Sequence, residues 1–150
     1  YAQGLSGLSA GTTYHYRIVA TNAEGTVSTP DATFTTSSVS TGGGTVTVSG
    51  GFVRPTILCL TPRTCIGSIS IVSRVALPAS AGKRGLVLGR ARFRVAAHHR
   101  AHVKLHLSKR ALAALRRKGK LRVTEQITSK LGGGHTAVTS RTVTLRAGRR

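Results

Sequence analysis

An alternation of apolar and polar residues limits the fold of this chain more than any other feature of its sequence. Near the start, every second residue is apolar, at Tyr14, Tyr16, Ile18 and Ala20. This is the pattern of a half-buried β-strand, in which successive side chains point to opposite faces. The same period of two returns in most of the sequence after Thr56. We therefore predict an all-β protein.

The surroundings of the first strand resemble the later half of a fibronectin type III domain. In that family a Leu-x-x-Gly-Thr-x-Tyr corner leads into the strand, and here it corresponds to Leu8, Gly11 and Tyr14. The resemblance implies that Tyr14 is a tyrosine corner, whose hydroxyl bonds to the backbone upstream. It also implies a turn at residues 22–25 and a last strand near residues 32–36, with its Phe side chain facing the core.

These pieces correspond to the final strands of a seven-stranded sandwich and cover residues 1–36. Because the earlier strands are absent and the chain begins at Tyr1, we interpret this segment as the C-terminal fragment of a fibronectin type III domain in a longer protein. Upstream domains of the same polypeptide would then be partners of the segment. An unrelated pair of antiparallel hairpins is the alternative. The resemblance implies an extracellular spacer or binding platform.

Residues 37–51 are rich in Ser, Thr and Gly, a composition typical of a flexible interdomain linker. Within this segment, residues 45–48 read Thr-Val-Thr-Val and could instead form a strand that pairs with a neighbouring sheet. We predict a linker over residues 37–51 and a second, basic, β-sandwich-like domain over residues 52–150.

Strands of the second domain are predicted from the same alternation. Odd positions after the cysteines are apolar, at Ile69, Ile71, Val75 and Leu77. Further on, Arg92 and Arg94 alternate with apolar residues, and so do His102, Lys104 and His106. With a turn over residues 96–101, these two stretches predict a hairpin that has one apolar and one basic face.

One short helix interrupts the strands. Ser108 is placed to cap its N-terminus, basic residues fill its last turn, and Gly119 ends it. Two closing strands, over residues 120–128 and 136–146, are joined by a loop that contains Gly132 and Gly133. The Cys-x-Gly start at Cys65, the Leu-Ser-Lys-Arg-Ala-Leu segment and the terminal Val-Thr-Leu resemble the C-terminal β modules of secreted actinobacterial surface proteins. That resemblance covers residues 55–145 and implies an exported structural module.

Cys59 and Cys65 are separated by five residues that include a proline, so a short turn can bring the two sulfurs together. A zinc site would need further ligands at a different spacing, and no histidine lies nearby to activate a thiol. We predict a disulfide, which is typical of exported proteins, with two reduced thiols as the alternative.

Charge is distributed unevenly between residues 1–50 and residues 51–150. Residues 1–50 hold one basic and two acidic residues, whereas residues 51–150 hold the other 22 basic residues and one acidic residue, for a net charge of +21. Residues 51–150 would therefore attract nucleic acid, anionic lipid or acidic wall polymer. The candidate contacts are the basic residues of the predicted hairpin, Arg92, Arg94, His102, Lys104 and His106. The alternative is that the charge reflects base composition of the genome and solubility alone.

The sequence offers few groups of residues that could carry out catalysis. Acid–base catalysis by paired carboxylates needs two, and the second domain holds only Glu125. His102 and His106 would lie about 13 Å apart on a strand, too far to share one metal ion. No cofactor motif is present, and no apolar run approaches the roughly 20 residues of a membrane-spanning helix.

The sequence therefore predicts a non-catalytic extracellular or wall-associated structural or adhesion module, whose partner is an acidic cell-wall polymer or polysaccharide. An accessory module of a secreted polysaccharide-active enzyme is the second hypothesis. A nucleic-acid-binding protein is the third, and it is disfavoured because a single-stranded nucleic-acid platform needs exposed aromatic residues.

Overall fold

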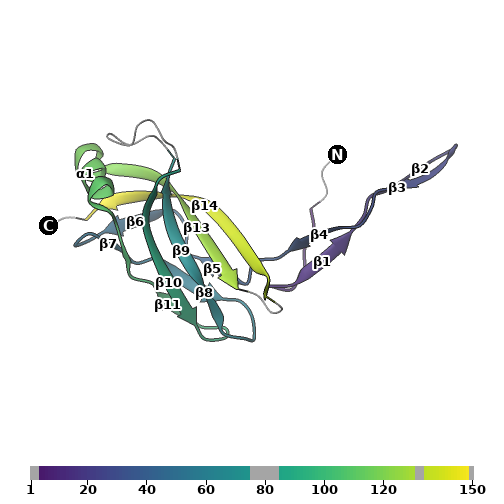
Figure 1. Ribbon diagram of the computed structural model, residues 1–150, viewed down its shortest axis with the longest axis horizontal. Coiled ribbons are helices and arrows are strands. Elements are labelled where there is room, and N and C mark those ends of the chain that lie inside the picture. The colour runs from purple at the N-terminus through teal and green to yellow at the C-terminus, as the bar shows by residue number, and fades with distance from the viewer. Residues whose placement is uncertain (1–3, 75–84, 131–133, 149–150) are drawn as a thin grey trace.

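A long β-ribbon and a pair of facing sheets make up the structure (Figure 1). The computed structural model describes residues 4–74, 85–130 and 134–148. Over these residues the protein is all-β with a single short helix, as the alternation predicted. The ribbon, called the arm below, extends away from one end of the sheets, and the helix lies at the other end (Figure 1).

The arm is a two-stranded antiparallel ribbon. Its inner part pairs β1 (Thr13–Tyr16) with β4 (Ala32–Thr35), and its outer part pairs β2 (Val19–Asn22) with β3 (Gly25–Ser28). At the tip, the side-chain oxygen of Asn22 accepts hydrogen bonds from the backbone N–H groups of Glu24 and Gly25, both at 3.0 Å. Asparagine favours such turns because its side chain can bond to the backbone two residues on.

The arm carries apolar side chains that the described residues leave uncovered. Tyr14 lies opposite Phe34, with ring centroids 5.7 Å apart. Further out, Tyr16 is 48% exposed, Ile18 64% and Val27 72%. At the base, the backbone N–H of Ser9 donates to the Tyr14 hydroxyl at 2.8 Å, which is the upstream backbone contact predicted for this residue.

Two sheets pack face to face in the rest of the chain. Sheet 1 has the strand order β10 (Val87–Val95), β9 (Cys65–Ser73), β13 (Lys120–Lys130), β14 (Thr136–Ala147) and β6 (Thr45–Val48). Its pairs are antiparallel except for the parallel pair of β6 and β14. The facing layer, called sheet 2 below, consists of two neighbouring hydrogen-bonded groups of short strands. One has the order β11 (Arg100–His102), β8 (Thr56–Cys59) and β5 (Val39–Thr41), and the other pairs β12 (Leu105–His106) with β7 (Phe52–Val53).

Pro55 explains why sheet 2 is divided into short strands. β8 pairs with β11 and with β5, and β7 pairs with β12. Between these pairs the carbonyl of Pro55 accepts from the Val103 N–H at 3.0 Å, but proline has no N–H to return the bond. The ladder is therefore interrupted there while the two segments stay side by side.

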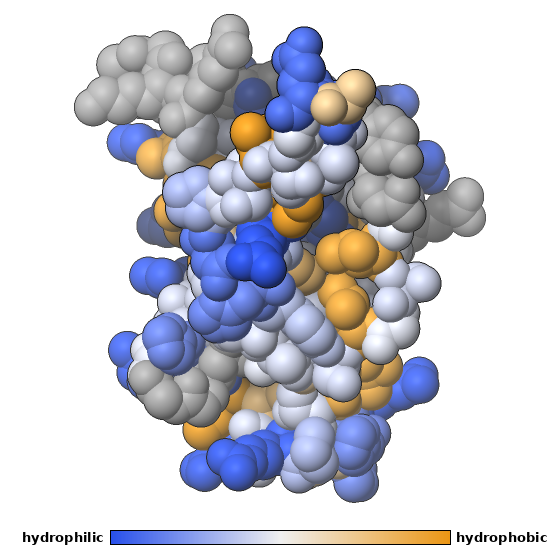
Figure 2. All heavy atoms as spheres, turned by 90° about the vertical axis from the view of Figure 1, so that its right-hand side faces the viewer, coloured by the Kyte–Doolittle hydropathy of each residue, from blue (hydrophilic) through white to orange (hydrophobic). Residues whose placement is uncertain are grey.

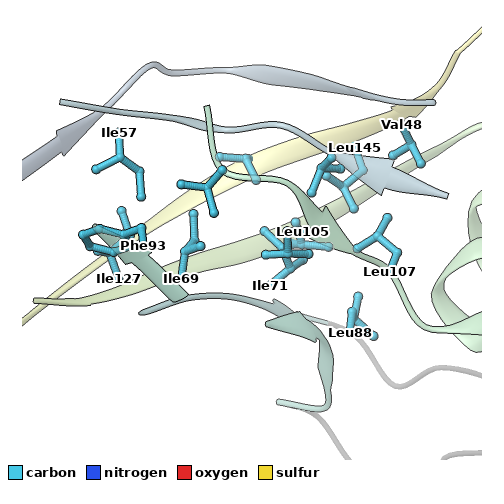
Figure 3. Packing of buried hydrophobic residues seen from close by; sticks show 14 of the residues in the cluster. Val48, Ile57, Ile69, Ile71, Leu88, Phe93, Leu105, Leu107, Ile127 and Leu145 are labelled. Atoms are coloured by element: carbon cyan, nitrogen blue, oxygen red, sulfur yellow. The ribbon is translucent and has the colours of Figure 1, made fainter. Parts of the chain in front are cut away.

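The core lies between the sheets and is almost entirely aliphatic (Figure 3). Sheet 1 contributes Ile69, Ile71, Ile127 and Leu145, and sheet 2 contributes Ile57 and Leu105, among other residues. Each full burial of such a side chain contributes about 1.5–3 kcal/mol. Phe93 is the one aromatic residue in this described cluster and is 6% exposed. The inward residues follow the period of two that the sequence displays.

The prediction of a flexible linker over residues 37–51 is wrong. β5 and β6 both lie within this segment and pair with β8 and β14, and Val39 and Val48 are buried in the core. Ser and Thr do not prevent a strand when the valines between them reach the core, and composition alone misses this. The alternative strand at residues 45–48 is confirmed as β6, so the sandwich includes residues that were assigned to the linker.

The predicted hairpin of residues 92–95 and 103–107 is also wrong. β10 pairs with β9 in sheet 1, whereas β11 and β12 pair with β8 and β7 in sheet 2. The chain crosses between the sheets after Val95, through a turn in which His98 has a positive φ of 55°. Both stretches point apolar residues at the same core from opposite sides, and a period of two cannot distinguish that arrangement from a hairpin.

The helix prediction is confirmed. In α1 (Lys109–Lys118) the Ser108 side chain accepts from the Ala111 N–H at 3.3 Å, and Gly119 follows with a φ of 67°. Ala111, Ala114 and Leu115 are buried. The closing strands are confirmed as β13 and β14, but Val75, Leu77, Gly132 and Gly133 lie outside the described residues. In the described part of the chain, no helix has the length and apolar character needed to span a membrane.

Candidate functional site

The five predicted polyanion contacts do not form one surface. Arg92 and Arg94 are exposed on edge strand β10 of sheet 1, where Phe93 and Val95 point to the core. His102, Lys104 and His106 are exposed on or beside the short strands of sheet 2. Because the two sheets face each other, their outward side chains point in opposite directions. The five residues therefore cannot contact one ligand together.

A hollow of about 470 Å³ lies on the outer face of sheet 1 and is called the sheet hollow below. Three cations line it: Arg90 and Arg92 from β10, and Lys130 from the end of β13. Strand register places Arg92 beside Ser68, and Ser68 beside Thr128. The remaining lining residues are Ile66, Gly67, Phe93 and Thr136. Positive charges and hydroxyl groups therefore lie close together on a shallow face, and the described residues that line it include no acidic side chain.

A second hollow, of about 460 Å³, separates the base of the arm from the loop between the two cysteines, and is called the arm hollow below. Ala10 and Gly11 line it from the arm, and residues 61–66 line it from the loop, with Ser38 and Lys130 completing the wall. Ile66 and Lys130 line both hollows, so the two are adjacent. Figure 2 views the molecule from the arm side and shows hydrophilic and hydrophobic groups close together on that end.

The predicted disulfide between Cys59 and Cys65 is confirmed and fixes the loop wall of the arm hollow. The two Cα atoms are 5.6 Å apart. Cys59 ends β8 in sheet 2 and Cys65 begins β9 in sheet 1, so the bond ties the two sheets together. Nearby, the Ser38 hydroxyl donates to the Ser129 hydroxyl at 2.8 Å, and both residues are buried. The end of the sandwich that carries the arm is therefore held firmly.

The predicted contacts of sheet 2 are already engaged with neighbours. The Lys104 ammonium lies 4.0 Å from the centre of the Phe52 ring, and the His106 ring lies 3.8 Å from it. A cation over an aromatic face is stabilised by the ring quadrupole. His102 Nδ1 lies 3.0 Å from the Thr56 hydroxyl. Sequence reasoning did not connect Phe52 with this cluster, since the residues meet only through the pairing of β7 with β12.

A buried ion pair joins β13 to β14. Glu125 is 1% exposed, and its Oε2 accepts from Arg141 Nε at 2.7 Å. Burial raises the pKa of Glu125 above its ordinary value, and the hydrogen bond and charge of Arg141 act in the opposite direction. Among the described residues, Glu125 Oε1 has no hydrogen-bond partner. One carboxylate held by a guanidinium does not provide an acid–base pair, so this group is structural.

The histidines do not form a metal site in the described part of the chain. No group of three or more His, Cys, Asp or Glu side chains there is placed to hold an ion. His99 Nδ1 instead lies 2.6 Å from the Ala97 carbonyl oxygen, within the turn that links the sheets.

Comparison with known proteins gives only distant likenesses. No family model and no curated protein matches the sequence. Among solved structures, murine CRIg is 7% identical, covers 74% of this chain and 98% of its own, and has a TM-score of 0.41. The collagen-binding subdomain of Enterococcus faecalis surface protein ACE is 8% identical, covers 68% and 93%, and has a TM-score of 0.33. At these scores the likeness assigns neither family nor function.

Proposed function

We propose that this protein is a non-catalytic extracellular binding module that holds acidic polysaccharide or wall polymer in the sheet hollow. The observation that carries this proposal is that Arg90, Arg92 and Lys130 line one hollow together with the hydroxyl side chains of Ser68, Thr128 and Thr136. Guanidinium groups bind carboxylate, sulfate and phosphate through paired hydrogen bonds, and serine and threonine hydroxyls can bond to sugar hydroxyls. The net charge of +21 over residues 51–150 would speed the approach of a polyanion.

The disulfide supports the extracellular assignment, because such bonds persist in oxidising compartments. For the arm, we propose that it belongs to a fibronectin type III-like sandwich whose other strands come from elsewhere in the polypeptide. The exposed side chains of Tyr16, Ile18 and Val27 and the hydrogen bond from the Ser9 N–H to the Tyr14 hydroxyl support this proposal. As a spacer, the arm would hold the binding domain in reach of its polymer. A secreted polysaccharide-active enzyme could use the same pair of spacer and binding domain as an accessory module.

Nucleic acid is the less favoured ligand. Single-strand binders stack bases on exposed aromatic rings, but Phe93, the aromatic residue that lines the sheet hollow, is 6% exposed. Without such rings, nucleic acid would be held by its phosphates alone, with steep salt dependence and no base preference.

The test is a titration of the full chain with heparin, an acidic wall polymer and duplex DNA. A triple substitution, Arg90→Ser, Arg92→Ser and Lys130→Ser, should weaken heparin binding by more than about tenfold and make it less sensitive to salt. The matched control is Arg116→Ser, Arg117→Ser and Lys118→Ser, which removes the same charge from the last turn of α1 at the opposite end of the sandwich.

The control should weaken binding by less than about threefold. Equal losses in the two triple variants would mean that net charge alone attracts the polymer and that the sheet hollow is no site. Tight, sequence-dependent binding of DNA would replace the proposed function with nucleic-acid recognition. Thermal unfolding of both variants confirms that they fold.

A further inference from the structure

We propose that the ligand is a linear anionic polysaccharide that runs from the sheet hollow, past Lys130, into the arm hollow. This inference rests on the proposed function and extends it by naming a path, a ligand shape and a second set of contacts. The starting observation is that Ile66 and Lys130 line both hollows, so a chain can pass from one to the other without leaving the surface.

Size supports a ligand longer than a single sugar. Each hollow has the volume of an ordinary small-molecule pocket, at about 470 and 460 Å³. A compact ligand would fill one hollow and gain nothing from the other. An extended chain can occupy both, and each added contact increases its affinity until the path is filled.

The charges are spaced along the whole path. Arg90 and Arg92 lie at one end, Lys130 at the junction and Arg63 in the loop wall at the other end. A repeating carboxylate or sulfate along a sugar chain would meet a cation in each part. Hydroxyl side chains accompany the cations in both hollows, namely Ser68, Thr128 and Thr136 in the first and Thr61 and Thr64 in the second.

The junction also offers an apolar contact that suits a sugar ring. Ile66 is 38% exposed between the hollows, whereas the next two outward residues of β9 are the polar Ser68 and Ser70. Sugar rings have a C–H face that packs against aliphatic groups, whereas a phosphate backbone does not. Exposed apolar groups in a pocket rimmed by polar residues are typical of ligand sites.

The arm forms one wall of this path and so contributes to binding. It does so with almost no net charge of its own, since residues 1–50 have a net charge of only −1. Gly11 and Ala10 line the hollow from the arm side. The Gly11 N–H donates to the Ser37 carbonyl at 3.3 Å, which anchors the base of the arm to the start of the sandwich. The base of the arm is therefore attached to the sandwich directly beside the arm hollow.

The test measures the affinity of the full chain for fully sulfated heparin fragments, a tetrasaccharide and a dodecasaccharide. We expect the dodecasaccharide to bind more tightly, by at least about tenfold. Arg63→Ser should weaken the dodecasaccharide by about fivefold and leave the tetrasaccharide unchanged, whereas Arg92→Ser should weaken both. The matched control is Arg110→Ser, an exposed arginine of α1 whose loss removes the same charge far from the arm.

The outcomes separate this inference from the proposed function. If both fragments bind through Arg92 with equal affinity, and Arg63→Ser has no effect, the sheet hollow stands and the two-hollow path is overturned. If neither fragment binds, the proposed function fails with it. If duplex DNA displaces the dodecasaccharide at equal charge concentration, or Arg110→Ser matches Arg63→Ser, the preference for a sugar chain on this path is refuted.

Discussion

Substitution of Arg141 by methionine should destabilise this protein far more than the loss of an ordinary surface cation. Arg141 Nε donates to Glu125 Oε2, and Arg141 Nη1 donates to the Thr41 carbonyl, both at 2.7 Å. Its Nη2 also donates to the Gly42 carbonyl. The Arg141 side chain is 24% exposed, whereas that of Glu125 is 1% exposed. Methionine keeps much of the hydrocarbon volume but leaves the buried carboxylate without compensation.

The expected loss is about 3 kcal/mol in the free energy of unfolding at neutral pH, because breaking a buried pair by removing one partner costs roughly 3–5 kcal/mol. An exposed pair would cost only about 0–1 kcal/mol. We choose the lower end of the first range since Arg141 is partly exposed and water can reach the space it leaves. The same change removes the contacts that tie the end of β5 to β14.

The loss should depend on pH. Burial raises the pKa of Glu125, and Arg141 opposes that rise, so removal of Arg141 raises the pKa further. A carboxyl group with a raised pKa in the folded state stabilises the fold fully below its unfolded pKa, and this contribution is lost as pH increases through the folded pKa. The deficit of the variant should therefore shrink as the pH is lowered and Glu125 becomes neutral.

The assay is urea unfolding of the parent, Arg141→Met, Glu125→Gln and the double variant, at neutral and acidic pH. Glu125→Gln should restore most of the stability that Arg141→Met removes, because the glutamine carries no charge. A loss below about 1 kcal/mol, as for a surface pair, would refute the reasoning. So would a loss that is the same at both pH values, or one that glutamine does not rescue.

Three further predictions concern the fold. Replacing Cys59 and Cys65 with serine should lower stability by about 2 kcal/mol in urea unfolding, since the disulfide closes a short loop; an unchanged midpoint would contradict this. Gly89→Ala should lower the free energy of unfolding by about 1–3 kcal/mol, because the added Cβ would lie 2.2 Å from the His106 carbonyl oxygen. Gly42→Ala should lower it much less, because nothing lies within 4 Å of a Cβ added there. In hydrogen exchange, the amides of β2 and β3 should exchange faster than those of β13, because the outer arm is exposed on both faces; equal protection would show that something covers the arm.

Local patterns were enough to predict much of the fold. Period-two alternation identified the strands around Tyr14 and Ile69, because a strand that is buried on one face alternates wherever it lies. Ser108 and Gly119 bounded the helix through capping contacts made within a few residues. The spacing of Cys59 and Cys65 predicted their disulfide for the same reason. The helix caps and the disulfide join residues close together in the sequence, and the alternation of a strand can be read within the strand itself.

Pairing between distant segments could not be predicted in the same way. Alternation predicts which residues of β10 and β12 face the core but not that they do so from opposite sheets, so Arg92 and Lys104 were wrongly placed on one face. The Ser/Thr/Gly segment around Val39 and Val48 became part of the sandwich only through its pairing with β8 and β14.

The candidate site also depends on pairing between distant segments. Arg92, Lys130 and Arg63 come from three separate segments, and register and the disulfide loop bring them to one surface. Most of the strands, the helix and the strongly positive part of the chain follow from the order of residues along the chain. Which of the positive charges lie together follows from the pairing of distant strands. The face on which a side chain points is a local property of its strand, whereas its neighbours depend on which strands pair.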